Sequence, residues 1–444
     1  MRAFAPCNGE KLKPVMLPAA QIDPQPASPD TLGLYISIPF CRSKCTYCNF
    51  ASGVYPASQH ARYVERLVAD LHASRNHARS LGVALPGTVD TIYFGGGTPV
   101  LLAPAHFHAL FQAIRENFAL TPDAEITVEC APGQLSDETL DALVTCGANR
   151  LSLGAQSFID RECSTSGRLH TRADVLRDLT RLRSAGIRNL NLDLLAGLAG
   201  QTLDSWRESL AVLLETAVPH ASVYMLEIDE DSRLGRELLQ GGARYHAALV
   251  PSDDTIATMY ETTISLFAAA GLAQYEISNF AQPGHASRHN LRYWSRAPYL
   301  GLGLDASSML FADGDSSSLR FTTTDDLAQY LDDSNSTPAS RTASSDPMLA
   351  ESAWLGPAQQ LEETWFLGLR RNSGVRVADL TRTFGAAAVA PLLAVAHRLV
   401  ADGLLDFHSG RFALTPRGRL LSNDVFAEFL VAHHEPSGSI PTSV

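Results

Sequence analysis

Short apolar segments alternate with longer amphipathic segments through the first half of the chain. The apolar segments are rich in β-branched residues and bounded by Gly, Pro or polar residues, as is typical of buried strands; they cover residues 34–38, 90–94, 125–129, 150–153, 189–195 and 221–226. Helical patterns lie between them at residues 58–80, 104–117, 137–146, 172–185 and 203–217. This alternation predicts right-handed crossovers and a parallel sheet, hence an α/β fold with too few units for a closed eight-stranded barrel.

The pattern changes in the last quarter of the chain. Residues 332–357 are rich in Ser, Thr, Asp and Ala, so we expect a linker or mobile loop there. Beyond it, helices are predicted at 361–370, 376–384, 391–402 and 422–430, with a hairpin formed by 404–407 and 411–414. The predicted units are a flexible tail at 1–32, a core at 33–331, the linker at 332–357, a smaller α+β, winged-helix-like domain at 358–433 and a tail at 434–444.

Composition narrows the class of protein. The chain has 444 residues, is 45% hydrophobic and carries a formal charge of -12, so nucleic acid is not an expected partner. We find no apolar run long enough to span a bilayer and no signal-peptide core, and we therefore expect a cytoplasmic protein that is not integral to a membrane. Four of the seven cysteines are expected to be ordinary buried thiols in a reducing compartment: Cys7, Cys130, Cys146 and Cys163.

The other three cysteines carry the strongest chemical signal. Cys41, Cys45 and Cys48 have the spacing C-x3-C-x2-C. Three such thiolates can hold three irons of a cubane 4Fe-4S cluster and leave the fourth iron open for a small molecule. A structural zinc site would need a fourth ligand, and no second Cys or His pair follows within the next 50 residues. We therefore predict an iron-sulfur site, with zinc or a chance cluster as the alternatives.

Further polar or flexible residues stand where predicted strands end. A GGGTP run at residues 95–99 follows the second strand, where it could be a tight turn or a close backbone approach to a ligand. Glu129, Gln156, Arg168 and Asp193 lie at or after the ends of later strands. Each alone could be an ordinary satisfied polar group, but together they indicate a ligand at the carboxyl ends of the strands.

These motifs carry a resemblance to a known superfamily. The cysteine run resembles the cluster motif of radical S-adenosylmethionine (SAM) proteins, in which SAM chelates the open iron, and GGGTP resembles their segment that gathers the amino end of SAM. Over about residues 33–430 the chain is similar to the oxygen-independent coproporphyrinogen III dehydrogenase family, HemN and HemW. The resemblance implies a (β/α)6 partial TIM barrel capped by the C-terminal domain. It implies SAM contacts from Tyr35, Tyr47, Gly96, Gly97, Thr98, Glu129, Gln156, Arg168 and Asp193.

Two features favour one branch of this family. The dehydrogenase branch looks like C-x3-C-x2-C-x-C, but Phe50 stands at the last position here, which favours the HemW branch. The run HNLRYW at 289–294 resembles the H-N-x-x-Y-W element associated with haem in HemW, and Arg288 or Arg292 could meet propionates. The implied haem residues are His289, Asn290, Tyr293 and Trp294. We hypothesise that His289 is the axial ligand of the haem iron. The alternative is a packed loop with a hydrogen-bonded histidine.

The resemblance implies a haem chaperone that binds a 4Fe-4S cluster, SAM and haem and delivers haem to acceptor proteins, which could include membrane-bound ones reached by peripheral contact. One alternative is the dehydrogenase, which makes protoporphyrinogen IX by radical decarboxylation, and another is a structural metal protein without SAM. Some positions depart from the family pattern. Ala196 and Ala199 stand where relatives commonly look like Tyr and Pro, and Cys130 and Ala131 stand where Ala and Asn are usual.

Overall fold

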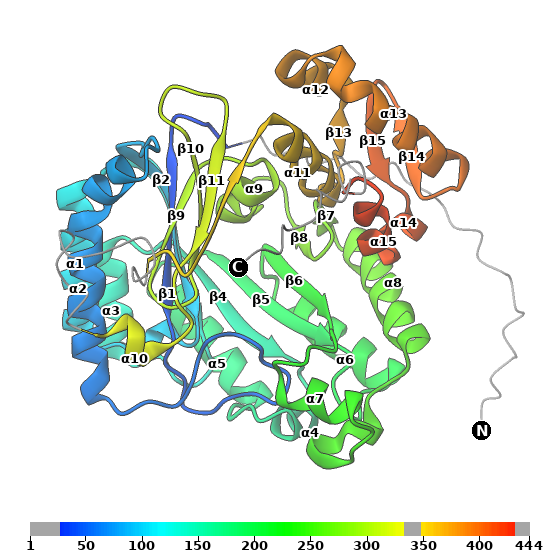
Figure 1. Ribbon diagram of the computed structural model, residues 1–444. Helices are drawn as coiled ribbons and strands as arrows, with labels where there is room; N and C mark the ends of the chain where they lie inside the picture. Colours follow the sequence, from blue (N-terminus) through cyan, green and yellow to red (C-terminus); the bar gives the residue numbers. More distant parts are fainter. Residues whose placement is uncertain (1–26, 333–347, 431–444) are drawn as a thin grey trace, which may run out of the picture.

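The computed structural model describes residues 27–332 and 348–430. Most of the expected tails and linker, together with Cys7, lie outside these residues. Six consecutive parallel strands form the centre of the structure, as predicted: β1 (Leu32–Ile38), β2 (Thr88–Gly96), β3 (Ala119–Cys130), β4 (Arg150–Gln156), β5 (Asn189–Ala196) and β6 (His220–Met225). Figure 1 shows them curving around a common interior.

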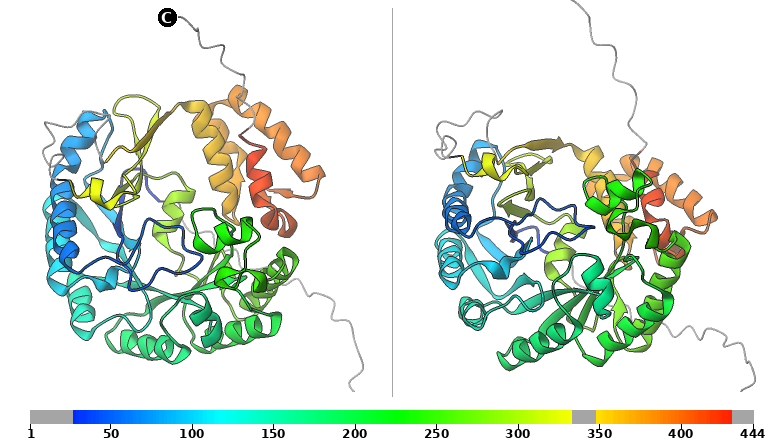
Figure 2. Two further views of the ribbon diagram at one scale, coloured as in Figure 1. Left: turned by 60° about the horizontal axis from the view of Figure 1, so that its bottom comes forward. Right: turned by 90° about the horizontal axis from the view of Figure 1, so that it is seen from below.

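Helices cover the outer face of this curved sheet, as both views in Figure 2 show. The crossovers contain α1 (Ser58–Ser80), η1 (Pro99–Leu101), α2 (Pro104–Asn117), α3 (Asp137–Cys146), α4 (Asp160–Thr165), α5 (Arg172–Ser184) and α6 (Leu203–Glu215). Local signals fix several of their ends. Ser136 caps α3 by accepting the Thr139 N–H, and Gly147 ends the helix at a φ of 98°, a conformation that favours glycine.

The sheet continues beyond the six predicted strands on both edges. Next to β1 lie β9 (Tyr299–Leu302), β10 (Ser307–Phe311), β11 (Ser318–Thr322) and β12 (Glu351–Leu355), and next to β6 lie β8 (Asn279–Ala281) and β7 (Ala273–Gln274). Apart from β9, which runs parallel to β1, these added strands pair in antiparallel fashion. The result is a twelve-stranded sheet.

The expected linker needs correction at its carboxyl end. Residues 351–355 form β12, which pairs with β11 from Ser318 opposite Leu355 to Thr322 opposite Glu351. The sequence pattern did not reveal this strand because it lies at the sheet edge, where most of its side chains are exposed and need not be apolar. The linker that we expected at 332–357 therefore ends before this strand in the structure.

The segment after β6 contains α7 (Arg233–Leu239), η2 (Arg244–Leu249), α8 (Asp253–Ala269), α9 (Arg288–Trp294) and, after β11, α10 (Leu327–Tyr330). The main core is built from the inner residues of the strands and the covering helices. No helix within residues 27–332 or 348–430 has both the length and the apolar character needed to cross a membrane.

The C-terminal domain has its own core and a three-stranded sheet in the order β13-β15-β14. Its elements are α11 (Pro357–Arg370), β13 (Val375–Arg376), α12 (Val377–Phe384), α13 (Ala386–Ala401), β14 (Leu405–His408), β15 (Arg411–Leu414), α14 (Pro416–Leu420) and α15 (Ser422–Ala427). Figure 1 shows this domain beside α9, β7 and β8. Ile277, from the loop before β8, is part of its core and joins it to the partial barrel.

Candidate functional site

A cavity of about 670 Å³ opens inside the partial barrel. Its wall includes the loop after β1, the ends of β2 to β6, the start of α9, and the α14–α15 junction of the C-terminal domain. Carboxyl ends of parallel strands are the usual ligand site in barrels and open α/β sheets. All three motif cysteines, Cys41, Cys45 and Cys48, lie on this wall.

The loop of residues 39–53, here called the cluster loop, presents these cysteines. All three are free thiols. Burial raises the pKa of Cys41, and the neighbouring Cys48 and Cys45 raise it further, as expected when thiols share one site. Within the described residues, no three His, Cys, Asp or Glu side chains stand close enough to hold a single metal ion. A cubane cluster places a different iron at each thiolate, so its protein ligands need not converge on one ion.

The glycine-rich run packs directly against the cluster loop. The Gly97 N–H donates to the Ile38 carbonyl at 2.8 Å, and the Thr98 N–H donates to the Phe40 carbonyl at 2.8 Å. A Cβ added to Gly97 would lie 2.8 Å from both carbonyl oxygens. Glycine is therefore required here by the approach of two backbone segments, whereas the sequence pattern indicated an approach to a ligand. Gly96, Gly97 and Thr98 also line the cavity.

Two carboxylates, one from β3 and one from β5, face this cavity. Glu129 Oε1 accepts the Tyr93 hydroxyl at 2.8 Å, and Asp193 accepts Ser152 Oγ at 3.0 Å and Asn191 Nδ2 at 2.7 Å. Burial raises the pKa of Glu129 to about 7, and the nearby Asp193 adds to this shift. Burial also raises the pKa of Asp193, against the effect of its hydrogen bonds. The wall can thus accept hydrogen bonds from an amine or from ribose hydroxyls.

The remaining predicted SAM residues divide into two groups. Tyr47, Gln156 and Arg168 line the cavity, with Arg168 donating to the Gly154 carbonyl and to Cys45 Sγ. Gln156 has a φ of 65°, a left-handed conformation that is strained for a non-glycine residue and typical of functional sites. Tyr35 is not part of the cavity wall, because its ring packs beside Tyr93, with 6.2 Å between centroids. The expected direct contact from Tyr35 is therefore not supported.

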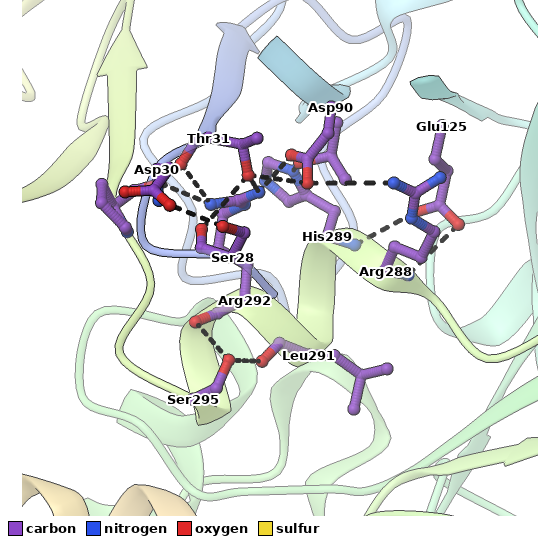
Figure 3. Close-up of polar contacts among 12 residues, drawn as sticks. Ser28, Asp30, Thr31, Asp90, Glu125, Arg288, His289, Leu291, Arg292 and Ser295 are labelled. Carbon is purple, nitrogen blue, oxygen red and sulfur yellow. Dashed lines mark hydrogen bonds and ion pairs between the residues drawn. The ribbon is translucent and has the colours of Figure 1, made fainter. Parts of the chain in front are cut away.

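The predicted axial histidine lies at the opposite end of the strands from the cysteines. His289 is 1% exposed; its Nδ1 pairs with Thr91 Oγ1 at 2.9 Å and its Nε2 with the Tyr293 hydroxyl at 2.8 Å. Burial lowers its pKa to about 3. Figure 3 shows α9 held by polar contacts to the amino-terminal parts of the first strands, including the ion pair between Arg292 and Asp90. Both ring nitrogens are hydrogen-bonded in this conformation, as the packed alternative predicts, and neither is free to ligate an iron.

The other residues of the haem element also have mainly structural contacts. Tyr293 packs edge-on against Tyr299, with centroids 4.6 Å apart, and the Arg370 guanidinium lies 4.4 Å from the Trp294 ring centre. Neither Tyr293 nor Trp294 lines the cavity, whereas Asn290 does. The two arginines proposed for propionates are paired with acidic residues instead: Arg292 with Asp90, and Arg288 with Asp123 and Asp90.

Sequence analysis missed a chain of hydrogen bonds that links Asp193 to α9. Asn191 Nδ2 donates to Asp193, and Asn191 Oδ1 lies 2.6 Å from His220 Nδ1. His220 Nε2 lies 2.9 Å from the Tyr275 hydroxyl, which accepts the Ser287 N–H at 3.1 Å. The contact with Asn191 Oδ1 requires a proton on Nδ1, and burial, which lowers the pKa of His220, favours a neutral ring whose Nε2 accepts the Tyr275 hydroxyl. A histidine at a strand start gave no motif signal, so only the fold reveals its role.

Comparison with known proteins agrees with this geometry. A family model described as the Radical SAM superfamily matches residues 35–213, and one described as the HemN C-terminal domain matches residues 355–421. Relatives named heme chaperone HemW are 32% identical in Lactococcus lactis (89% of this chain, 97% of the relative) and 33% identical in Bacillus subtilis (89% and 98%). Coproporphyrinogen III oxidase (HemN) from Escherichia coli has a similar structure, with a TM-score of 0.74 at 24% identity over 90% of this chain and 91% of that one.

A partial barrel with a three-cysteine loop and a glycine-rich turn at one end of its strands defines a radical SAM fold, and the family model confirms this class. The likeness to the E. coli oxidase, at 24% identity, supports the fold alone. Because the identity to the curated relatives extends over almost their whole length, the chain belongs to the HemW family, as Phe50 and the HNLRYW run indicated. Membership of the superfamily implies a 4Fe-4S cluster and SAM, and the free thiols and polar wall of the cavity fit both.

Proposed function

We propose that the protein is a haem chaperone, which binds haem in the cavity and transfers it to acceptor proteins. Cys41, Cys45 and Cys48 would hold the 4Fe-4S cluster, which provides an open iron for SAM. Glu129, Asp193 and the other cavity residues of the predicted set would hold the rest of the SAM molecule. The free thiols suit the cytoplasm, and the acceptors could include membrane-bound haem proteins reached by peripheral contact.

The observation that carries this proposal is an apolar rim around the cavity. Four large apolar side chains that are exposed to solvent also line the cavity, and they come from four separate segments: Phe50, Leu169, Tyr224 and Leu421. Exposed apolar groups gathered at one opening usually mark a binding site. A flat, largely apolar macrocycle such as haem would cover these side chains, whereas SAM is too polar to need such a rim.

We expect stoichiometric haem binding by the cluster-reconstituted protein under anaerobic conditions, followed through the Soret band. Phe50 is 59% exposed at the rim, so replacing it with Ser should weaken haem affinity by about tenfold through lost apolar contact, without loss of fold. Leu239→Ser is the matched control, because Leu239 is 64% exposed but lies away from the cavity. Absence of haem binding by the parent protein would disprove the chaperone proposal.

The dehydrogenase alternative is distinguished by its products. Incubation with SAM, a reductant and coproporphyrinogen III should give no 5'-deoxyadenosine coupled to protoporphyrinogen if the protein is a chaperone. A fixed ratio between these two products would establish the enzyme instead. The similarity in fold to the E. coli oxidase does not decide between the chaperone and the dehydrogenase, since one fold can support both activities.

SAM binding should depend on pH through Glu129. Its pKa is raised to about 7, so the carboxylate that would accept hydrogen bonds from SAM forms mainly above pH 7, and SAM affinity should rise between pH 6 and 8. The stability of the fold changes in the opposite direction. Because the ionised carboxylate is buried, the free energy of unfolding falls as pH rises through 7. Glu129→Gln should therefore bind SAM about tenfold more weakly at pH 8, with most of its pH dependence lost, yet be at least as thermostable as the parent there.

Equilibrium dialysis with SAM and thermal unfolding at pH 6 and 8 would measure both effects. Glu215→Gln is the control, because Glu215 is an exposed residue at the end of α6. Unchanged SAM affinity and pH dependence in Glu129→Gln would show that Glu129 does not contact SAM.

A further inference from the structure

Four arginines line the cavity, and none of them forms an ion pair within the described residues: Arg42, Arg150, Arg168 and Arg370. Arg42 lies in the cluster loop and Arg168 donates to Cys45, which leaves Arg150 and Arg370. Arg150, near the start of β4, is 2% exposed, and Arg370 ends α11 of the C-terminal domain. Other buried arginines of this chain are paired with acidic residues: Arg66 with Asp70, Arg292 with Asp90 and Arg296 with Glu363. Within the described residues, neither Arg150 nor Arg370 forms an ion pair. Their charges therefore remain available to an anion inside the cavity.

The surroundings of Arg150 are neutral. Its Nη1 donates to Asn189 Oδ1 at 2.7 Å and to the His285 carbonyl at 3.3 Å. Burial lowers the pKa of His220 and of His285, and the Arg150 charge lowers both further, so these rings stay uncharged. A buried guanidinium that contacts only neutral acceptors is stabilised strongly when a carboxylate completes its shell.

An independent observation at the same place points to a ligand. Thr127 lies opposite Arg150 in the pairing of β3 with β4, is 0% exposed and lines the cavity. Its Oγ1 is buried and has no hydrogen-bond partner in the described parts of the chain. Buried hydroxyls are almost always paired, so this one is free to donate to a ligand oxygen.

Arg370 is presented to the cavity in a comparable way. Its guanidinium stacks 4.4 Å from the centre of the Trp294 ring, and its Nε is buried without a hydrogen-bond partner in the described parts. Burial raises the pKa of the Glu276 carboxyl, which lies near enough for the Arg370 charge to lower that pKa in part, but the two residues form no ion pair. Stacking on an aromatic face leaves the in-plane N–H groups of a guanidinium available for a carboxylate.

Both arginines flank one segment of the chain, residues 275–294, which contains the family signature. Arg150 donates to the His285 carbonyl, while the Arg370 carbonyl accepts the Ile277 N–H at 3.2 Å and its side chain covers Trp294. The two carboxylates of haem likewise lie on one edge of the macrocycle. The polar wall and the apolar rim of the cavity thus match the two edges of an amphipathic porphyrin.

We propose that Arg150, together with Thr127, binds one propionate of haem and that Arg370 binds the other. The propionate edge then faces the segment 275–294, and the apolar edge faces the rim formed by Phe50, Leu169, Tyr224 and Leu421. This inference rests on the proposed function, and it assigns the carboxylate contacts to arginines outside the HNLRYW run. The signature segment supports them, with Trp294 as the stacking surface for Arg370.

The test compares haem with its dimethyl ester, in which both carboxylates are blocked, on the full-length, cluster-reconstituted chain. The parent should bind haem at least about tenfold more tightly than the ester. Arg150→Met and Arg370→Met should each weaken haem binding by about tenfold or more and leave ester binding within twofold, and Arg150→Lys should restore part of the loss. Arg188→Met and Arg376→Met, at exposed positions away from the cavity, should change neither.

Each other outcome is decisive. Equal binding of haem and ester by the parent would overturn the carboxylate proposal and leave the chaperone function standing, whereas binding of neither would overturn the chaperone function itself. If the Met variants lose SAM affinity but keep haem affinity, the arginines serve the carboxylate of SAM and the proposal fails. Should Arg150→Met not fold, as judged by circular dichroism, Arg370→Met and the ester comparison still decide.

Discussion

Replacing any one of Cys41, Cys45 and Cys48 with Ala is expected to abolish the reconstituted 4Fe-4S cluster, with iron content falling from about four atoms per chain to nearly none. The cluster loop supplies three thiols to one cavity wall, and the fourth iron is reserved for SAM. The fourth iron of the cluster already lacks a protein ligand, so the cluster does not persist when one of its three thiolates is also removed. Visible absorption and iron and sulfide analysis after anaerobic reconstitution measure the effect.

Cys130→Ala is the matched control for this experiment. Cys130 lines the same cavity, but it lies at the end of β3, outside the cluster loop, and its thiol donates to the Ala131 carbonyl. Its replacement should leave the cluster intact. If all three motif variants retain the parent spectrum, or if Cys130→Ala removes it, the ligand assignment is wrong.

Local sequence signals were sufficient for most of the partial barrel. The ends of α1, α2 and α3 were predicted to the residue. Local signals mark several of these ends, since Pro104 begins α2, Ser136 caps α3 and Gly147 ends it. The six central strands were found because parallel strands are buried on both faces and read as continuous apolar runs. The cysteines and GGGTP were recognised for the same reason: each motif is contiguous in sequence.

Features that depend on distant segments were not predictable in this way. The HNLRYW run identified the family correctly, but which side chains of α9 face the cavity depends on its packing against the starts of β1 to β3. Arg150 and His220 stand at the beginnings of strands, where a polar residue gives no signal of function. Their roles depend on partners such as His285 and Tyr275, which lie more than 50 residues away.

A second large effect, a loss of stability, is expected when the buried His289 is replaced with Ala. Its ring joins Thr91 in β2 to Tyr293 in α9, and its backbone N–H donates to Glu125 at 3.1 Å. Replacing it with Ala leaves two buried hydroxyls without partners and opens a void beside Tyr93, whose ring stacks 5.3 Å from the imidazole. We estimate a loss of about 2–4 kcal/mol in the free energy of unfolding from these causes together.

His289→Ala should accordingly unfold several degrees below the parent but keep the parent's Soret maximum when haem is bound, because this ring has no free nitrogen for iron.

The stability difference between His289→Ala and the parent should also depend on pH. The pKa of His289 is about 3, below its ordinary value, so its contribution is complete above about pH 6.5 and is lost as pH falls. The variant should therefore lose less stability than the parent between pH 7 and 5. His408→Ala, at an exposed position in β14, is the control. A Soret shift or loss of haem in a folded His289→Ala protein would instead establish this histidine as the axial ligand, and would require α9 to move when haem binds.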